Sequence, residues 1–181
     1  VNYIGPTILE LGSEAQKKSI LPALIEGKCK LAFAQTEREA RYDLAHVACR
    51  AQKSDNGYTL DGEKYVVLHA PCADTFIVSA RTSGNTTDKE GISLFVVDRN
   101  APGVTLKPYR TLDNLRAADV SFSGTVVPED GLIGAEGEAL ALIEEVVDYA
   151  TALLCAEAVG AIKFANDTTL EYLKTRIQFG V

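Results

Sequence analysis

Side chains able to contact a ligand gather at the end of a predicted strand, residues 31–36. The small side chains of Ala32, Ala34 and Thr36 alternate with larger ones, a period of two that indicates β structure. Small residues on one face let a flat ligand approach the backbone. At Glu37 the apolar pattern stops and a polar, charged loop is predicted. Because ligands gather where a rigid scaffold passes into a loop, this junction is a candidate site; the alternative is an edge strand before a solvated loop.

Other reactive groups lack partners at useful spacing. His46 and His69 have no nearby nucleophile or second metal ligand, so structural roles are expected. Glu144 and Glu145 are interpreted as a solvated face of a helix. The turn Gly134–Gly137 before a helix could hold an anion, although a simple turn is favoured. No metal site is predicted.

Composition excludes several classes of protein. The chain has 181 residues, 46% of them hydrophobic, so it can bury a sizeable core. The net charge of -7 argues against binding the nucleic-acid backbone, and no membrane span or signal peptide is expected. Four scattered cysteines without a Cys-x-x-Cys pair indicate reduced thiols in a cytosolic protein. Because methionine is absent, the chain is expected to be an internal fragment of a longer protein.

A short helix is predicted near the start. Ser13 and Gln16 have the spacing of a capping box, in which each side chain bonds the other residue's backbone amide. Gly27 is a credible stop. Pro22 lies inside the apolar pattern, so the helix is expected to be broken or kinked there.

The middle of the chain has β character. The turn residues Asn56 and Gly57, a strong hairpin signal, lie between two predicted strands, Val47–Lys53 and Tyr58–Leu68. Further strands are predicted at Thr75–Arg81, Ile92–Val97, Val104–Leu106, Val120–Phe122 and Thr125–Val127. Several short strands at this spacing are typical of a closed or sandwiched antiparallel sheet.

The end of the chain has a helical period. No proline interrupts Glu138–Arg176, and only Gly160 lowers the helix propensity. One long helix, or two with a soft joint, is therefore predicted. Its apolar stripe exceeds what a small β domain can cover, so neighbouring helices are expected from missing chain or another subunit. The fold class is α+β, in the order helix, β domain, long helix.

Several segments, in order along the chain, resemble acyl-CoA dehydrogenases. They are Leu9–Lys18 with Leu21-Pro22, Ala32–Glu37, Gly57–Lys64, Val127-Pro128 with Leu132–Gly134, and Arg176–Gly180. The resemblance implies the end of an N-terminal helical domain over 1–29, a middle β-barrel domain over 30–134, and the start of an incomplete C-terminal helical bundle over 135–181. Residues 41–44, 66–69 and 152–160 look more narrowly like the small subunit of bacterial pimeloyl-CoA dehydrogenases.

The resemblance implies FAD-dependent α,β-dehydrogenation of an acyl-CoA thioester. In that family a carboxylate removes the α-proton while the β-hydrogen leaves as hydride to the flavin. The carboxylate is expected outside this chain, so no catalytic base is named here. The implied partners are the acyl-CoA substrate and a homo- or hetero-oligomer with a large acyl-CoA dehydrogenase subunit, in the bacterial cytoplasm.

The resemblance also assigns binding roles. Phe33, Gln35 and Thr36 are expected to line the flavin ring, Gln35 by its backbone amide and Thr36 by its hydroxyl. Residues corresponding to those that reach a neighbouring subunit's FAD are Arg176, Gln178 and Phe179; an arginine there could grip the pyrophosphate in a bidentate manner. The alternative for Arg176 is an ordinary cation near a helix C-terminus.

The departures from the family lie at the expected site. Val66 stands where an aromatic residue is usual beside the flavin, and Leu68 where a hydroxyl is usual. Tyr42 replaces a serine that contacts substrate, and a position on the long helix often held by arginine is Thr151. Two hypotheses therefore stay open: an FAD-binding subunit, or a non-catalytic structural partner of a catalytic large subunit. A stand-alone flavin-binding barrel is a weaker third.

Overall fold

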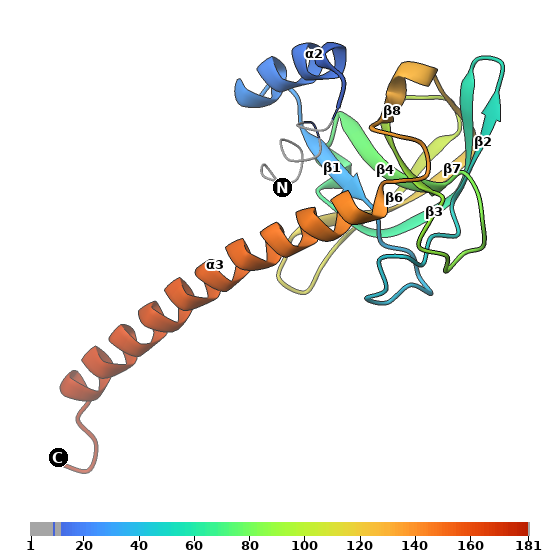
Figure 1. Ribbon diagram of the computed structural model, residues 1–181. Coiled ribbons are helices and arrows are strands. Elements are labelled where there is room, and N and C mark those ends of the chain that lie inside the picture. Colours follow the sequence, from blue (N-terminus) through green and yellow to red (C-terminus); the bar gives the residue numbers. More distant parts are fainter. Residues whose placement is uncertain (1–8, 10–11, 181) are drawn as a thin grey trace. The chain divides into compact units, whose positions relative to one another are not determined.

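The computed structural model describes residue 9 and residues 12–180. The chain forms two compact units, Val1–Val146 and Val147–Val181. The first holds the short helix and all the strands, and the second is most of the long helix and its end (Figure 1). The start of the expected N-terminal helical segment, residues 1–8, 10 and 11, lies outside the described residues.

Helix α2, Glu14–Ile25, begins at the predicted capping box. Ser13 Oγ accepts from the amide of Gln16 at 3.2 Å, and Gln16 Oε1 accepts from the amide of Ser13 at 2.8 Å. Gly27 follows the last turn with φ 71°, as a stop requires. The helix runs through Pro22 without a break, which was one of the two outcomes predicted there. The Pro22 carbonyl still accepts from the amide of Glu26 at 3.0 Å, so the helix continues past the residue that lacks a donor.

Eight strands form one sheet in the order β6-β7-β3-β2-β4-β5-β8, with β1 paired to β4. Strands β1 and β2 run parallel to β4, so the sheet is mixed rather than wholly antiparallel. The path of the sheet ends at β6 and β8, and β1 pairs on one side only, with β4. The expected α+β order of a short helix, a sheet-rich domain and a long helix is confirmed. The strands are β1 Leu31–Ala34, β2 Arg50–Ser54, β3 Gly57–Leu68, β4 Thr75–Arg81, β5 Ile92–Asp98, β6 Val104–Arg110, β7 Arg116–Val127 and β8 Leu132–Ile133; two 3-10 turns are η1 Ala70–Cys72 and η2 Glu129–Gly131.

Strand β2 begins later than predicted because side chains bind the backbone ahead of it. The amides of Ala48 and Cys49 donate to the carboxylate of Glu37. The carbonyl of Val47 accepts from Arg81 Nε at 3.0 Å. These backbone groups are therefore satisfied without a strand partner.

Strand β7 replaces two predicted short strands. Gly124, which lies between those two predicted strands, has φ 60° at a register shift opposite Asp61. Its amide donates to Asp61 Oδ1 at 2.8 Å, which is how a bulge keeps a strand continuous. Strand β6 extends beyond its predicted end through Pro108, which is tolerated because β6 is an edge strand.

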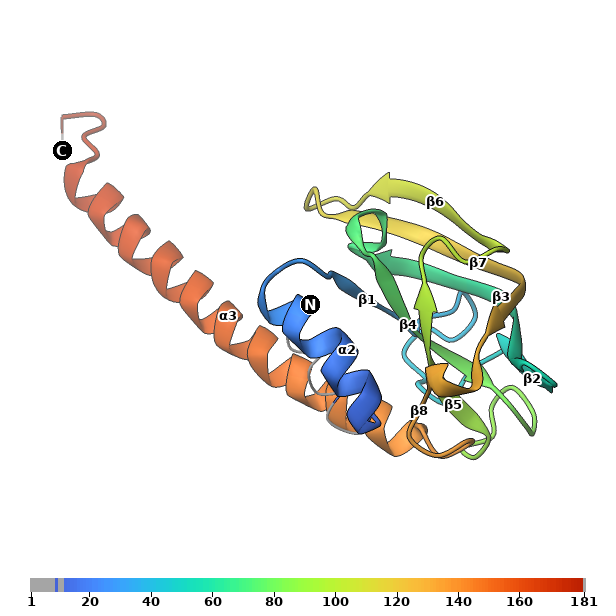
Figure 2. The same ribbon diagram turned by 90° about the horizontal axis from the view of Figure 1, so that it is seen from above.

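One core cluster joins most of the strands. The rings of Tyr58 on β3 and Phe95 on β5 lie 5.0 Å apart between centroids, although these strands are not neighbours in the sheet. The sheet therefore curls around its apolar face, as Figure 2 shows. Buried side chains of this cluster include Ala32, Ala34, Tyr58, Leu60, Phe76, Val78, Phe95, Val120 and Phe122.

Arg81, at the end of β4, is buried and organises two loops. Its guanidinium donates to six backbone carbonyls, those of Val47, Ser83, Glu90, Ala45, Thr86 and Asp88, at 2.8 to 3.4 Å. Burial lowers the pKa of Arg81 from its ordinary value, yet guanidinium stays charged in proteins. Carbonyl dipoles thus take the place of water around this cation.

Helix α3, Leu140–Thr175, confirms the predicted long helix and is not interrupted at Gly160. Its first turns bury Leu140, Ile143 and Val146 in the first unit, while Glu144 and Glu145 are exposed as expected. In the second unit, apolar side chains along the helix are exposed: Leu153, Leu154, Val159, Ile162, Phe164, Leu170 and Leu173. None of the helices in the described part of the chain is long and apolar enough to cross a membrane.

Replacing Arg81 tests its role in the loops. We expect Arg81→Met to lower the free energy of unfolding by about 3 kcal/mol, because several buried carbonyls lose their only charged donor. Arg50, paired with Arg81 in register but exposed, is the matched control, and Arg50→Met should cost less than about 0.5 kcal/mol. Urea unfolding measures both; equal losses would contradict the role given to Arg81.

Tyr58 makes stability depend on pH at the alkaline end. Burial, followed by its hydrogen bond to Glu136, raises the pKa of Tyr58 from 10.0 to about 12. A raised folded pKa gives stability that is complete below pH 10 and is lost as pH rises to about 12. Tyr58→Phe should show a shallower fall over this window in urea unfolding, and identical profiles would contradict the assignment.

Candidate functional site

A buried ion pair lies beneath the predicted strand–loop junction. Lys64 on β3 is 0% exposed, and its Nζ lies 2.6 Å from Oε1 of Glu37. The ammonium also donates to Ser79 Oγ on β4 at 3.0 Å and to the carbonyl of Gln35 at 3.3 Å. All three ammonium hydrogens thus have acceptors, which a buried lysine requires. The pair joins β3, β4 and the segment after β1.

Glu37 is equally well satisfied. Besides the ammonium of Lys64, it accepts from the amide of Ala48 at 2.6 Å and from that of Cys49 at 3.0 Å. Glu37 is buried, so the alternative of a solvated loop does not hold at the first residue of this loop. A signal for its partner was present: Lys64 shares a face of β3 with the buried Tyr58 and Leu60, where a lysine needs a carboxylate.

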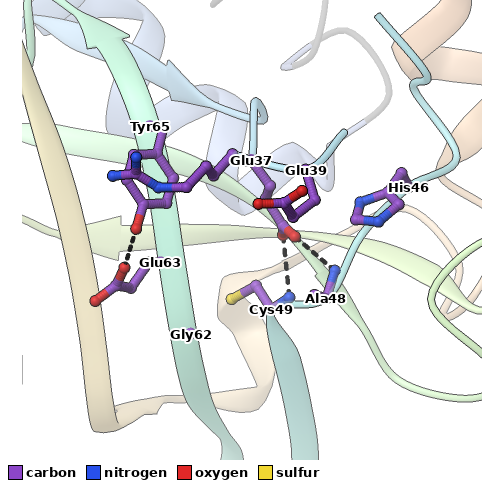
Figure 3. A pocket seen from close by; sticks show the side chains of 9 residues that line it. Glu37, Glu39, His46, Ala48, Cys49, Gly62, Glu63 and Tyr65 are labelled. Atoms are coloured by element: carbon purple, nitrogen blue, oxygen red, sulfur yellow. Dashed lines mark hydrogen bonds between the residues drawn. The ribbon is translucent and has the colours of Figure 1, made fainter. Parts of the chain in front are cut away.

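A pocket of about 200 Å³ lies beside this pair (Figure 3). It is lined by Glu37, Arg38, Glu39, His46, Ala48, Cys49, Gly62, Glu63 and Tyr65. The guanidinium of Arg38 stacks 4.2 Å from the ring centroid of Tyr65, whose hydroxyl donates to Glu63. Burial raises the pKa of the Cys49 thiol to about 11, so it is no nucleophile at neutral pH.

The polar groups of this pocket do not form a catalytic set. Glu37 is held by three donors and cannot act as a free base. Nδ1 of His46 is buried without a hydrogen-bond partner among the described residues, so no general base or acid partner holds this ring. No cluster of three or more metal-ligating side chains occurs in the part of the chain that the structure describes.

The residues expected along the flavin ring lie on β1 and in the two residues that follow it. Phe33 is half-buried on β1, and the side chain of Gln35 is buried. The Thr36 carbonyl accepts from the amide of Tyr65 at 2.8 Å, which places the end of β1 beside β3. The Thr36 hydroxyl is exposed and has no partner among residues 9 and 12–180.

Next to that contact, β3 is strained. Val66 has φ 51°, in the left-handed region that a β-branched residue rarely adopts, at the register shift between Lys64 and Val67. Its amide donates to Asp119 Oδ1 at 3.3 Å, an oxygen that also accepts from the hydroxyl of Tyr109. Such strain persists only where neighbouring contacts over-determine it.

The strained segment of β3 carries exposed apolar side chains. Val66 is 50% exposed and Leu68 is 43% exposed. The bond between Thr36 and Tyr65 brings the end of β1 to the residue before Val66, and Leu68 lies further along the same strand.

The remaining predicted residues lie elsewhere. Tyr42 projects into solvent from the loop after Glu37, with 99% of its surface exposed. Arg176, Gln178 and Phe179 belong to the second unit and are exposed. The guanidinium of Arg176 lies 5.4 Å over the ring of Tyr172, a local cation–π contact.

A double-mutant cycle tests the buried pair. Lys64→Met and Glu37→Gln should each lower the free energy of unfolding by about 4 kcal/mol, because each leaves a buried partner group unmatched. The double variant should cost about 2 kcal/mol less than the sum of the two. Urea unfolding of the three variants and the parent gives the coupling. Additive losses would show that the two groups do not interact.

Comparisons with known proteins agree with this architecture. Residues 32–125, just over half of the chain, match the family model "Acyl-CoA dehydrogenase, middle domain". The L-prolyl-[peptidyl-carrier protein] dehydrogenase of Serratia sp. (strain ATCC 39006) is 32% identical over 176 residues, covering 96% of this chain and 45% of that protein.

Two solved structures extend the likeness to three dimensions. The FAD complex of PigA has a TM-score of 0.90 at 32% identity, covering 96% of this chain and 46% of that one. Butyryl-CoA dehydrogenase from Megasphaera elsdenii has a TM-score of 0.92 at 31% identity, covering 100% of this chain and 48% of that one.

The chain thus spans about half the length of the relatives it matches. Its family match covers the strands that carry the junction of β1 and β3, and the likeness to the solved structures continues through both helices. This chain belongs to the acyl-CoA dehydrogenase family.

Proposed function

We propose that the protein containing this chain is an FAD-dependent acyl-CoA dehydrogenase subunit that introduces an α,β double bond into an acyl-CoA thioester. Family membership supports this proposal, as does the likeness to PigA, which was solved as an FAD complex. We propose the divisions 1–29, 30–134 and 135–181 for its helical, middle and C-terminal parts.

The observation that carries the proposal is the junction of β1 and β3. There the Thr36 carbonyl accepts from the amide of Tyr65, the residue before Val66, and the Thr36 hydroxyl has no partner in the described part of the chain. Val66 and Leu68, further along β3, expose apolar side chains. An isoalloxazine ring needs apolar contact on its faces and hydrogen bonds at its pyrimidine edge, so the residues present fit the group. When bound, FAD supplies the acceptor for the hydride that leaves the substrate.

The chain's own residues would orient the flavin and exclude water. Thr36 would bond the pyrimidine edge through its hydroxyl, and Gln35 through its backbone amide. The buried pair of Lys64 and Glu37 keeps this strand end fixed, because movement would expose or unpair two charges. Val66 and Leu68 would shield one side from solvent, without the stacking an aromatic residue provides.

The other residues would complete the site in an oligomer. Arg176, Gln178 and Phe179 would reach the FAD of a neighbouring subunit, and Arg176 would bind the pyrophosphate. Tyr42 would contact substrate. The catalytic carboxylate would come from outside this chain. A dicarboxylic, pimeloyl-CoA-like thioester is the proposed substrate, and a large acyl-CoA dehydrogenase subunit the proposed partner. The four free cysteines support a reducing compartment, the bacterial cytoplasm.

A second candidate is a non-catalytic partner subunit with a degenerate flavin site. It is favoured by the side chains at positions 66 and 68, since valine and leucine neither stack on a flavin as an aromatic does nor donate a hydrogen bond. In that case the same surface would contribute only to an interface with the catalytic subunit.

The visible absorption spectrum separates the candidates. We expect flavin bands in the full-length protein purified alone or with its partner subunit. Flavin in the protein alone would support a complete site, and flavin only in the pair a shared one. A complex that folds and assembles without flavin would contradict the first candidate and favour the second.

A matched pair of variants locates the cofactor. Thr36→Val should weaken FAD binding about tenfold, since it removes one hydrogen bond and preserves shape. Thr105→Val, at an exposed position on β6, is the control and should leave affinity unchanged. Titration of the apoprotein with FAD measures both; equal affinities for the two variants would place the flavin elsewhere.

A further inference from the structure

Two arginines face each other across the β6–β7 hairpin. Arg110 ends β6, Arg116 begins β7, and the two are direct partners in the antiparallel register. Like charges directly opposite each other destabilise a strand pair. The arrangement is therefore unfavourable for the isolated hairpin unless something negative lies between them.

The described residues supply no carboxylate to either guanidinium. Arg110 Nη1 donates to Asn114 Oδ1 at 2.7 Å, which orients this side chain without neutralising it. Arg116 has no side-chain hydrogen bond or ion pair within the described part of the chain. Two acids of the same hairpin bond hydroxyl groups: Asp113 accepts from the hydroxyl of Thr111, and Asp119 from that of Tyr109.

Both arginines line one pocket of about 310 Å³, whose other lining residues are Pro71, Pro108 and Tyr109. The wall at Pro71, in η1, is held by Arg99, whose Nη1 donates to the carbonyls of Pro71 at 2.5 Å and Ala73 at 3.3 Å. Two proline rings and a tyrosine that is hydrogen-bonded to Asp119 form rigid walls, so a ligand would meet a shaped surface. This pocket is separate in its lining from the one beside Glu37.

We propose that Arg110 and Arg116 form a binding site for a small anion, a phosphoryl or carboxylate group, seated in this pocket. Guanidinium presents a planar fork that matches the oxygens of both groups, and two forks from facing strands can grip one anion together. A bound anion removes the cross-strand repulsion. A local pair of unneutralised cations also stands out in a chain of net charge -7. The site goes beyond the proposed flavin chemistry and does not depend on it.

Calorimetric titration of the full-length protein at low ionic strength tests the site. The probes are inorganic pyrophosphate for phosphoryl groups and glutarate for carboxylates. We expect saturable binding of at least one, with a dissociation constant of about 1 mM or tighter. Arg110→Gln and Arg116→Gln should each weaken it about tenfold, and added salt should weaken it further.

The matched control is Arg50→Gln, which removes an exposed arginine of β2 far along the sheet order from β6. The affinity of the Arg50→Gln variant for pyrophosphate or glutarate should stay within about twofold of that of the parent. Thermal unfolding gives a second readout. Pyrophosphate or glutarate should raise the melting temperature of the parent and of Arg50→Gln, but not that of the Arg110→Gln/Arg116→Gln double variant.

The outcomes separate the sources of the anion. Tighter binding of pyrophosphate identifies a phosphorylated ligand, and tighter binding of glutarate a carboxylate. Binding of neither probe, or binding that the double variant retains, overturns the proposal. Since no readout involves flavin or dehydrogenation, failure here leaves the proposed function standing, and failure of flavin binding leaves this site standing.

Discussion

The ion pair between Lys64 and Glu37 is the constraint on which the first unit depends. Both charges are removed from water, so every lone pair and ammonium hydrogen must find a partner within the protein. Meeting that demand brings together β3, Ser79 on β4, the carbonyl of Gln35 and the amides that precede β2. One polar contact thereby fixes where β1 ends relative to three other strands.

Close to this pair, the backbone of β3 is strained at Val66, whose side chain is exposed. Val66 adopts a left-handed conformation two residues from Lys64, braced by Asp119, and so turns β3 beside the end of β1. Arg81 performs a similar task for two loops with backbone carbonyls instead of carboxylates. Rigid polar anchoring beneath an exposed apolar strip is a suitable scaffold for a flat cofactor.

The second unit has a different physical character. Its helix carries apolar side chains that are exposed in this chain, including Ile162 and Phe164. A helix with such an apolar stripe needs a partner that removes the stripe from water. The chain spans about half the length of its relatives, so we propose that the rest of the C-terminal bundle or a neighbouring subunit covers it.

The sequence by itself determined the elements whose signals are local. The capping box at Ser13, the turn at Gly57 and the unbroken helical period from Leu140 each depend on neighbours within a few residues, and the structure confirms all three. The resemblance of short motifs identified the family for the same reason.

Only the tertiary structure decided what depends on distant partners. The burial of Glu37 was not predicted, because its partner, Lys64, lies 27 residues away in the sequence. The predicted start of β2 was too early, because the side chains of Glu37 and Arg81 form hydrogen bonds with the backbone of the residues just before the strand. Likewise, Arg110 and Arg116 become a pair only once β6 and β7 are in register. Burial and charge pairing are properties of the folded chain, since they arise where segments remote in sequence exclude water together.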